Sequence, residues 1–275
     1  MADPLVVAFS VSESPDMRRY GQSDGHLRHA LRTSAHYPLE RGYDLAYGGD
    51  LRPNGFTEFL KDTAFDYRRL GDSRPRFTDY LAWPVHIRLA SQDLRDMEER
   101  FGGIGRLVLL GEDGRRLTMG ERAALSSREP ANDEWADGLS AMRDAMTAES
   151  SGRVVLGGRV ERYRGRMPGV AEEALASLRA KRPLFLIGGF GGCARGIAEA
   201  LGLVETWPGS LSWLGQELFS EFGVDDLHND LSEDENRLLA ESPYLDDMIL
   251  LFMRGLYRQR CRLTQETGES RAENA

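Results

Sequence analysis

Short apolar runs that end in polar or glycine-rich segments recur along the chain. We expect buried strands at 5–10, 43–47, 106–111, 154–156 and 184–187. Between them, apolar residues at helical spacing predict helices at about 25–41, 92–101 and 170–180. Strands that alternate with helices predict an α/β fold, with a Rossmann-like parallel sheet, flanking helices and a helical C-terminal extension.

Two segments of the N-terminal part have patterns of their own. Residues 83–89 alternate between apolar and polar positions, which predicts a half-buried strand. Residues from about 118 to 151 are charged and carry Trp135 and Met142 at helical spacing, which predicts a helical excursion before the sheet resumes.

The C-terminal part is mostly helical in pattern. Helices are predicted over 211–222 and 244–263, and Ser232 begins a capping box between them. We therefore expect a Rossmann-like domain over 1–205, a helical extension over 206–265 and a disordered tail over 266–275.

Three predicted strands end in pairs of glycines. These pairs are Gly48-Gly49, Gly157-Gly158 and Gly188-Gly189, the last followed by Phe190, Gly191 and Gly192 before a helix. Glycine lets the backbone approach a ligand closely, and a helix N-terminus favours an anion such as phosphate. Since the carboxyl ends of parallel strands line one crevice, we expect an anion site there. A tight turn with nothing bound is the alternative.

Other groups at these strand ends suit the same chemistry. Ser10, Ser12 and Glu13 follow the first strand, where such side chains contact ribose and phosphate or serve as caps and turn residues. An arginine-dense loop at 159–166 suits an anionic ligand or a solvated surface. The candidate ligand-binding residues are Ser10, Ser12, Glu13, Gly48, Gly49, Asp50, Arg52, Gly55, Phe56, Thr57, Gly157, Gly158, Arg159, Gly188, Gly189, Phe190, Gly191, Gly192 and Arg195.

Composition excludes several classes of protein. The net charge of −9 argues against general nucleic-acid binding, and no apolar run is long enough to span a membrane. Without a signal-peptide pattern, we expect a cytoplasmic protein. The two cysteines, Cys193 and Cys261, cannot build a disulfide framework or a metal site. Cys193 begins a predicted helix, where it is either a reactive thiol or a small packed residue.

No metal or cofactor is expected. His29 and His36 lie two turns apart on one predicted helix, but a histidine pair without a third ligand is more often packed or solvated.

Taken together, the segments 47–57, 157–159 and 187–192 resemble the SLOG superfamily. This Rossmann-like group includes lysine-decarboxylase-like phosphoribohydrolases, Smf-type DNA-processing proteins and ligand sensors of bacterial defence systems. The resemblance covers roughly the first 200 residues, and the C-terminal part is similar to that of defence-associated members. It implies that a nucleotide binds at the glycine turns.

The chain departs from the phosphoribohydrolase motif Pro-Gly-Gly-x-Gly-Thr-x-x-Glu. Ile187 replaces the proline, Gly192 the threonine, and Arg195 the catalytic glutamate. An arginine cannot take the acid–base role of a carboxylate, although it can hold a phosphate. Glu199 lies four residues beyond Arg195, so a helix would join the two as an ion pair.

These observations favour a binding module over an enzyme. We expect a sensor of an ADP-ribose-like or cyclic nucleotide signal that acts as a homo-oligomer, with an effector protein as a candidate partner. The alternative is a nucleotide N-glycoside hydrolase, with Glu13, Asp16, Asp50 or Glu173 in place of the missing glutamate. No catalytic residue is assigned. A scaffold without a ligand is a third hypothesis.

Overall fold

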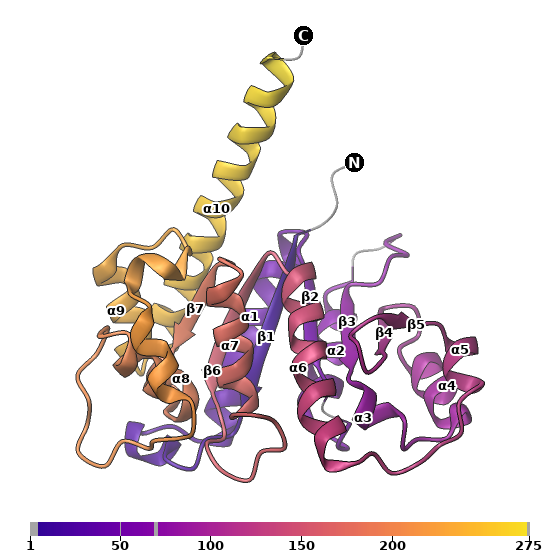
Figure 1. Cartoon of the computed structure of the whole chain (residues 1–275). Helices are drawn as coiled ribbons and strands as arrows, with labels where there is room; N and C mark the ends of the chain where they lie inside the picture. Colours follow the sequence, from indigo (N-terminus) through magenta and orange to yellow (C-terminus); the bar gives the residue numbers. More distant parts are fainter. Residues whose placement is uncertain (1–4, 50, 69–70, 274–275) are drawn as a thin grey trace.

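The structure is a computed structural model, and it describes residues 5–49, 51–68 and 71–273. Within these residues a seven-stranded sheet has the order β5-β4-β3-β2-β1-β6-β7 (Figure 1). Its strands are β1 (Val6–Ser12), β2 (Asp44–Gly48), β3 (Phe77–Leu81), β4 (Gly105–Leu110), β5 (Arg116–Leu117), β6 (Gly152–Gly157) and β7 (Leu184–Ile187). All neighbouring strands are parallel except β4 and β5, which are antiparallel. The predicted Rossmann-like α/β fold is confirmed.

The strand order reverses at β1. The chain builds outward from β1 to β4, crosses back, and adds β6 and β7 on the other side of β1. Open α/β sheets bind ligands outside the carboxyl ends of the strands at such a reversal. These ends lie on the lower side of the molecule in Figure 1.

Helices cover both faces of the sheet. In β1, Val7 and Phe9 join the apolar core on one face, whereas Ala8 packs on the opposite face. This alternation places a helical layer on each side. The first layer contains α1 (Asp24–Glu40), α2 (Phe56–Asp66) and α10 (Leu245–Glu273); the second contains α6 (Asn132–Glu149), α7 (Gly169–Arg179) and α8 (Gly192–Ala200).

Shorter elements complete the fold. They are α3 (Trp83–His86), α4 (Ser91–Arg100), α5 (Met119–Ala123), α9 (Glu233–Glu241) and the 3-10 helices Met17–Tyr20, Gly188–Phe190, Gln216–Glu221 and Val224–Leu227. The predicted capping box at Ser232 is confirmed, since its side chain accepts a hydrogen bond from the Glu235 N–H.

The C-terminal helix packs on the sheet through its first half. The ring of Phe252 meets that of Phe185 edge to face, with centroids 5.1 Å apart. Beyond the sheet, α10 extends away from the body on the side opposite the carboxyl ends of the strands (Figure 1). The helix continues to Glu273, and 274–275 lie outside the described residues. Once the packed half has formed, each further residue adds a helical hydrogen bond without a new nucleus.

Two predicted elements are wrong. Residues 83–86 form the helical turn α3 rather than a strand, because Pro84 lacks the N–H that a strand ladder needs and suits a first helical turn. Only Gln216–Glu221 is helical within 211–222. Gly215, with φ of +89°, turns the chain before this short helix.

A buried arginine holds the segment after α3. Arg122 Nη2 donates to the carbonyl oxygens of His86 and Leu89 at 2.9 and 2.7 Å, and Nε donates to His86 Nδ1 at 3.2 Å. His86 Nε2 donates to the Leu110 carbonyl oxygen at 2.8 Å. Burial lowers the pKa of His86 from 6.5 to about 4, so the ring is neutral at pH 7.

This depressed pKa makes stability depend on pH. Between pH 6.5 and about 4 the unfolded chain binds a proton at His86 that the folded chain does not. The free energy of unfolding should therefore fall by about 3 kcal/mol through this window because of His86 alone. Urea unfolding at pH 7 and pH 4 should show this loss in the wild type and a smaller loss in His86→Gln. The exposed control His29→Gln should behave as wild type, and identical pH dependence in all three proteins would refute the assignment.

Candidate functional site

The loops after β1, β2 and β6 meet at the reversal of strand order. Ser12 pairs with Gly157 at the carboxyl ends of β1 and β6, and β2 ends at Gly48 on the other side of β1. The predicted glycine pairs of β2 and β6 are thus brought to either side of the β1 loop. We call the edge formed by 12–16, 48–49, 51–52 and 157–159 the crevice.

The turn after β6 is fixed by the end of β1. The Gly158 N–H donates to the Ser12 carbonyl oxygen at 2.9 Å, and the Arg159 N–H donates to Ser12 Oγ at 2.8 Å. Gly157 and Gly158 have φ of +60° and +117°, a conformation that favours glycine. Arg159 is exposed, and its guanidinium has no hydrogen-bond or ion-pair partner among the described residues.

The turn after β2 is held by a carboxylate of the neighbouring strand. The Gly49 N–H and the Thr57 hydroxyl donate to the same Asp79 oxygen, at 3.3 and 3.2 Å. Gly55 is the N-cap residue of α2 and, as a glycine, gives this helix no side-chain hydrogen bond. Phe56 is buried in the apolar core. Asp50, also a predicted site residue, lies outside the described residues.

One carboxylate–guanidinium contact joins the β1 and β2 loops. Arg52 Nη2 lies 3.9 Å from Glu13 Oε2, and their side chains are 57% and 33% exposed. Glu13 Oε2 is itself buried and has no hydrogen-bond partner among the described residues. The contact is therefore long, and it leaves Glu13 Oε2 without a hydrogen bond.

The turn after β7 is closely packed by the chain itself. A Cβ on Gly188 would lie 2.2 Å from the Ala240 carbonyl oxygen, and one on Gly189 would lie 2.4 Å from the Ser242 carbonyl oxygen. Phe190 is buried. These glycines allow α9 and the loop after it to approach the β7 turn.

The N-terminus of α8 already holds an anion, the carboxylate of Asp16. Asp16 Oδ1 accepts a hydrogen bond from the Gly192 N–H at 2.9 Å, and a Cβ on Gly191 would lie 2.6 Å from the same oxygen. The Cys193 N–H donates to the Gly158 carbonyl oxygen at 3.1 Å. A carboxylate at this position satisfies the positive end of the helix.

Arg195 also has partners within the chain. Its Nε lies 3.1 Å from Glu199 Oε1, which confirms the ion pair expected from their spacing, and Nη2 donates to the Glu205 carbonyl oxygen at 3.0 Å. The guanidinium also lies 5.8 Å from the ring centroids of Tyr20 and Trp207. With 4% of its surface exposed, Arg195 is a packed residue of the α8 region.

Ser10 belongs to a buried polar network beneath the crevice. Arg153 Nη1 donates to Ser10 Oγ at 2.8 Å and lies 3.1 Å from Glu173 Oε2, which also accepts a hydrogen bond from the Ser10 hydroxyl. The network joins β1, β6 and α7. Arg153 is not among the residues predicted from the sequence, although an arginine inside the apolar run of β6 indicates a buried partner.

The sequence was compared with models of known protein families. The SLOG cluster2 family matches residues 1–210, which is more than half of the 275 residues. The chain belongs to the SLOG family. No curated protein matches its sequence. Among the described residues of this SLOG protein, no helix combines the length and apolar character needed to cross a lipid bilayer.

The carboxylates of this SLOG protein that were candidates for a catalytic role differ in how they are bonded. Asp16 caps α8, and Glu173 is held by Arg153 and Ser10. Among the described residues, Glu13 is the candidate carboxylate whose oxygen lies at the crevice without a hydrogen bond, and Asp50 lies outside these residues. Cys193 is buried, and burial raises the pKa of its thiol to about 12, so it is a packed residue rather than a reactive one.

The Asp16 cap has a measurable effect on the SLOG domain. Asp16→Ala should lower the free energy of unfolding by about 1–2 kcal/mol, because the buried Gly192 N–H loses its acceptor. Asp16→Asn keeps a carbonyl oxygen and should lose less. Urea denaturation measures both, and an Asp16→Ala variant as stable as wild type would contradict this role.

Proposed function

We propose that this SLOG protein binds a nucleotide-derived small molecule, ADP-ribose-like or a cyclic nucleotide, in the crevice at the ends of β1, β2 and β6. Family membership supports a nucleotide-related function. The observation that carries the location is the contrast between two turns at this edge of the sheet. The N-terminus of α8 is already capped by Asp16, whereas the exposed Arg159 guanidinium after β6 has no hydrogen-bond or ion-pair partner among the described residues. Phosphate binding therefore fits the crevice beside Arg159 better than the start of α8.

The charges around the crevice suit an anion. Arg159 and Arg52 extend from opposite sides of the β1 loop, and the Arg159 guanidinium has no hydrogen-bond or ion-pair partner among the described residues. Guanidinium groups bind phosphate oxygens through paired hydrogen bonds. In a chain of net charge −9, two arginines at one strand-end crevice favour an anionic ligand.

The packing around the crevice supports a sensor rather than a simple binding protein. The β1 loop contacts the β7 turn, since Ser14 Oγ donates to the Phe190 carbonyl oxygen. The β7 turn in turn touches α9 through Gly188 and Gly189. A ligand that shifts the β1 loop would thus act on the helical extension. In this proposal the extension contacts a second copy or an effector protein in a cytoplasmic bacterial stress or defence system.

Glu13 supports a second candidate function. Its unbonded oxygen lies at the crevice, where a carboxylate could stabilise the cationic sugar formed when an N-glycosidic bond breaks. The protein would then be a nucleotide N-glycoside hydrolase that uses Glu13 in place of the glutamate lost at Arg195.

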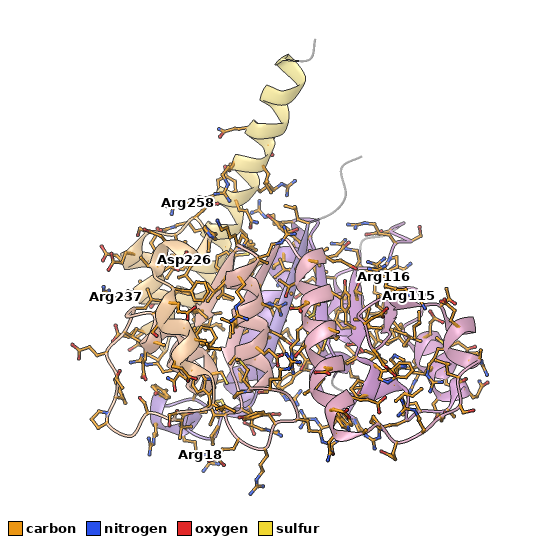
Figure 2. The ribbon with its side chains drawn as sticks, in the orientation of Figure 1. Arg18, Arg115, Arg116, Asp226, Arg237 and Arg258 are labelled. Atoms are coloured by element: carbon orange, nitrogen blue, oxygen red, sulfur yellow. The ribbon has the colours of Figure 1, made fainter. Side chains whose placement is uncertain are left out.

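Native mass spectrometry with a ligand panel tests the proposal. The panel contains AMP, NAD, ADP-ribose, cyclic ADP-ribose isomers and cyclic dinucleotides. We expect one intact ligand to be retained, with affinity at least tenfold weaker in Arg159→Ala because a charge-assisted contact is lost. Arg237→Ala is the matched control, since Arg237 lies on α9, away from the crevice, and pairs with Glu233 (Figure 2).

The outcomes separate the candidate functions. An intact ligand that Arg159→Ala loses and Arg237→Ala keeps supports the sensor. Release of free base that Glu13→Gln abolishes supports the hydrolase. If no compound of the panel is retained and none is broken down, both functions are contradicted and a scaffold without a ligand is favoured.

A further inference from the structure

A cavity opens beside the crevice, between the start of α2 and the end of α4. It has a volume of about 190 Å³, and its walls include Leu51, Arg52, Thr57, Met97, Arg100 and Phe101. A larger hollow of about 710 Å³ shares Leu51, Met97 and Arg100 with it and continues along α4. None of the interactions described for the crevice requires this space.

Two residues join the cavity to the crevice. Arg52 lines the cavity, and its Nη2 lies 3.9 Å from Glu13 Oε2 at the end of β1. Thr57 also lines the cavity, and it shares an Asp79 oxygen with the Gly49 N–H. A ligand held at Gly49 and Arg52 can therefore reach into the cavity without crossing another element.

The walls suit a flat, partly apolar group. Leu51, Met97 and Phe101 supply apolar surface, whereas the Arg100 guanidinium makes no hydrogen bond or ion pair with any described residue. Complete small-molecule sites usually measure about 300–1,000 Å³. A cavity of about 190 Å³ thus fits one end of a ligand rather than the whole of it.

We propose that this cavity holds the base of the nucleotide whose phosphate lies in the crevice. The inference rests on the proposed function, and it adds a binding site for the base of the ligand. The faces of the base contact the apolar walls, and acceptor atoms at its edge receive hydrogen bonds from Arg100. The ligand then runs from the β1–β6 edge across β2 towards α4. Only a ligand that has a base in addition to its sugar phosphate can fill both sites.

Photo-crosslinking with 8-azido-AMP and 8-azido-GMP tests this placement. We expect saturable label on peptides 51–61 or 97–101, because these segments surround the cavity. Met97→Trp fills the cavity and should reduce the label at least tenfold, while binding of ribose 5-phosphate, which has no base, stays as in wild type. Arg100→Ala should weaken nucleotide binding about tenfold through the lost charged hydrogen bond.

Arg95→Ala is the matched control, since Arg95 lies on the same helix and bonds to Gln92. Because Arg100 is exposed, Arg100→Ala should fold normally. It therefore tests the site even if Met97→Trp fails to fold. Label near Arg159 that ribose 5-phosphate displaces would overturn the base site and leave the proposed function standing. Label undiminished in both cavity variants would also overturn it, and the absence of binding by every nucleotide and by ribose 5-phosphate would overturn both proposals.

Discussion

The close approach of three loops at the carboxyl edge of the sheet is the constraint on which the rest of the structure depends. A Cβ on Gly192 would lie 2.2 Å from the Gly158 carbonyl oxygen and 2.6 Å from Ser14 Cβ. The loops after β1, β6 and β7 therefore form one packed unit, with Asp16 bonded at its centre. Because this packing fills the N-terminus of α8, the open part of the edge lies towards β2.

A second constraint lies directly beneath this edge. Arg153 is fully buried, and Glu173, Ser10, Ser177 and Thr147 satisfy its guanidinium. Such a network is costly to break because each remaining charge would be buried without a partner. It ties β1 and β6 to α7, so the two strands that frame the reversal keep a fixed separation below the crevice.

The sequence predicted the elements whose signals are local. The apolar strands, the glycine pairs and the Arg195–Glu199 pair depend on neighbours a few residues away. The failures arise where a proline or glycine within the segment, or a distant contact, overrides the apolar pattern. Residues 83–89 alternate like a strand, but Pro84 and the bonds of His86 to Leu110 and Arg122 favour a helical turn.

The same limit applies to the candidate site. A glycine-rich turn before a helix has one sequence pattern whether it holds a phosphate or packs against its own chain. At α8 the difference is made by Asp16, which is 176 residues away from Gly192 in sequence. The family match shows the SLOG fold and supports a nucleotide-related function, but it does not say which turn of the edge is occupied by its own chain.

Backbone hydrogen exchange with and without ADP-ribose or a cyclic dinucleotide tests this account most directly. Ligand should slow exchange at 49–57 and 159–160, the segments that carry Arg52 and Arg159. Exchange at 188–195 should be slow in the free protein and unchanged by ligand, because that turn is already packed and capped. Ligand protection confined to 188–195, with none at 49–57, would contradict the account.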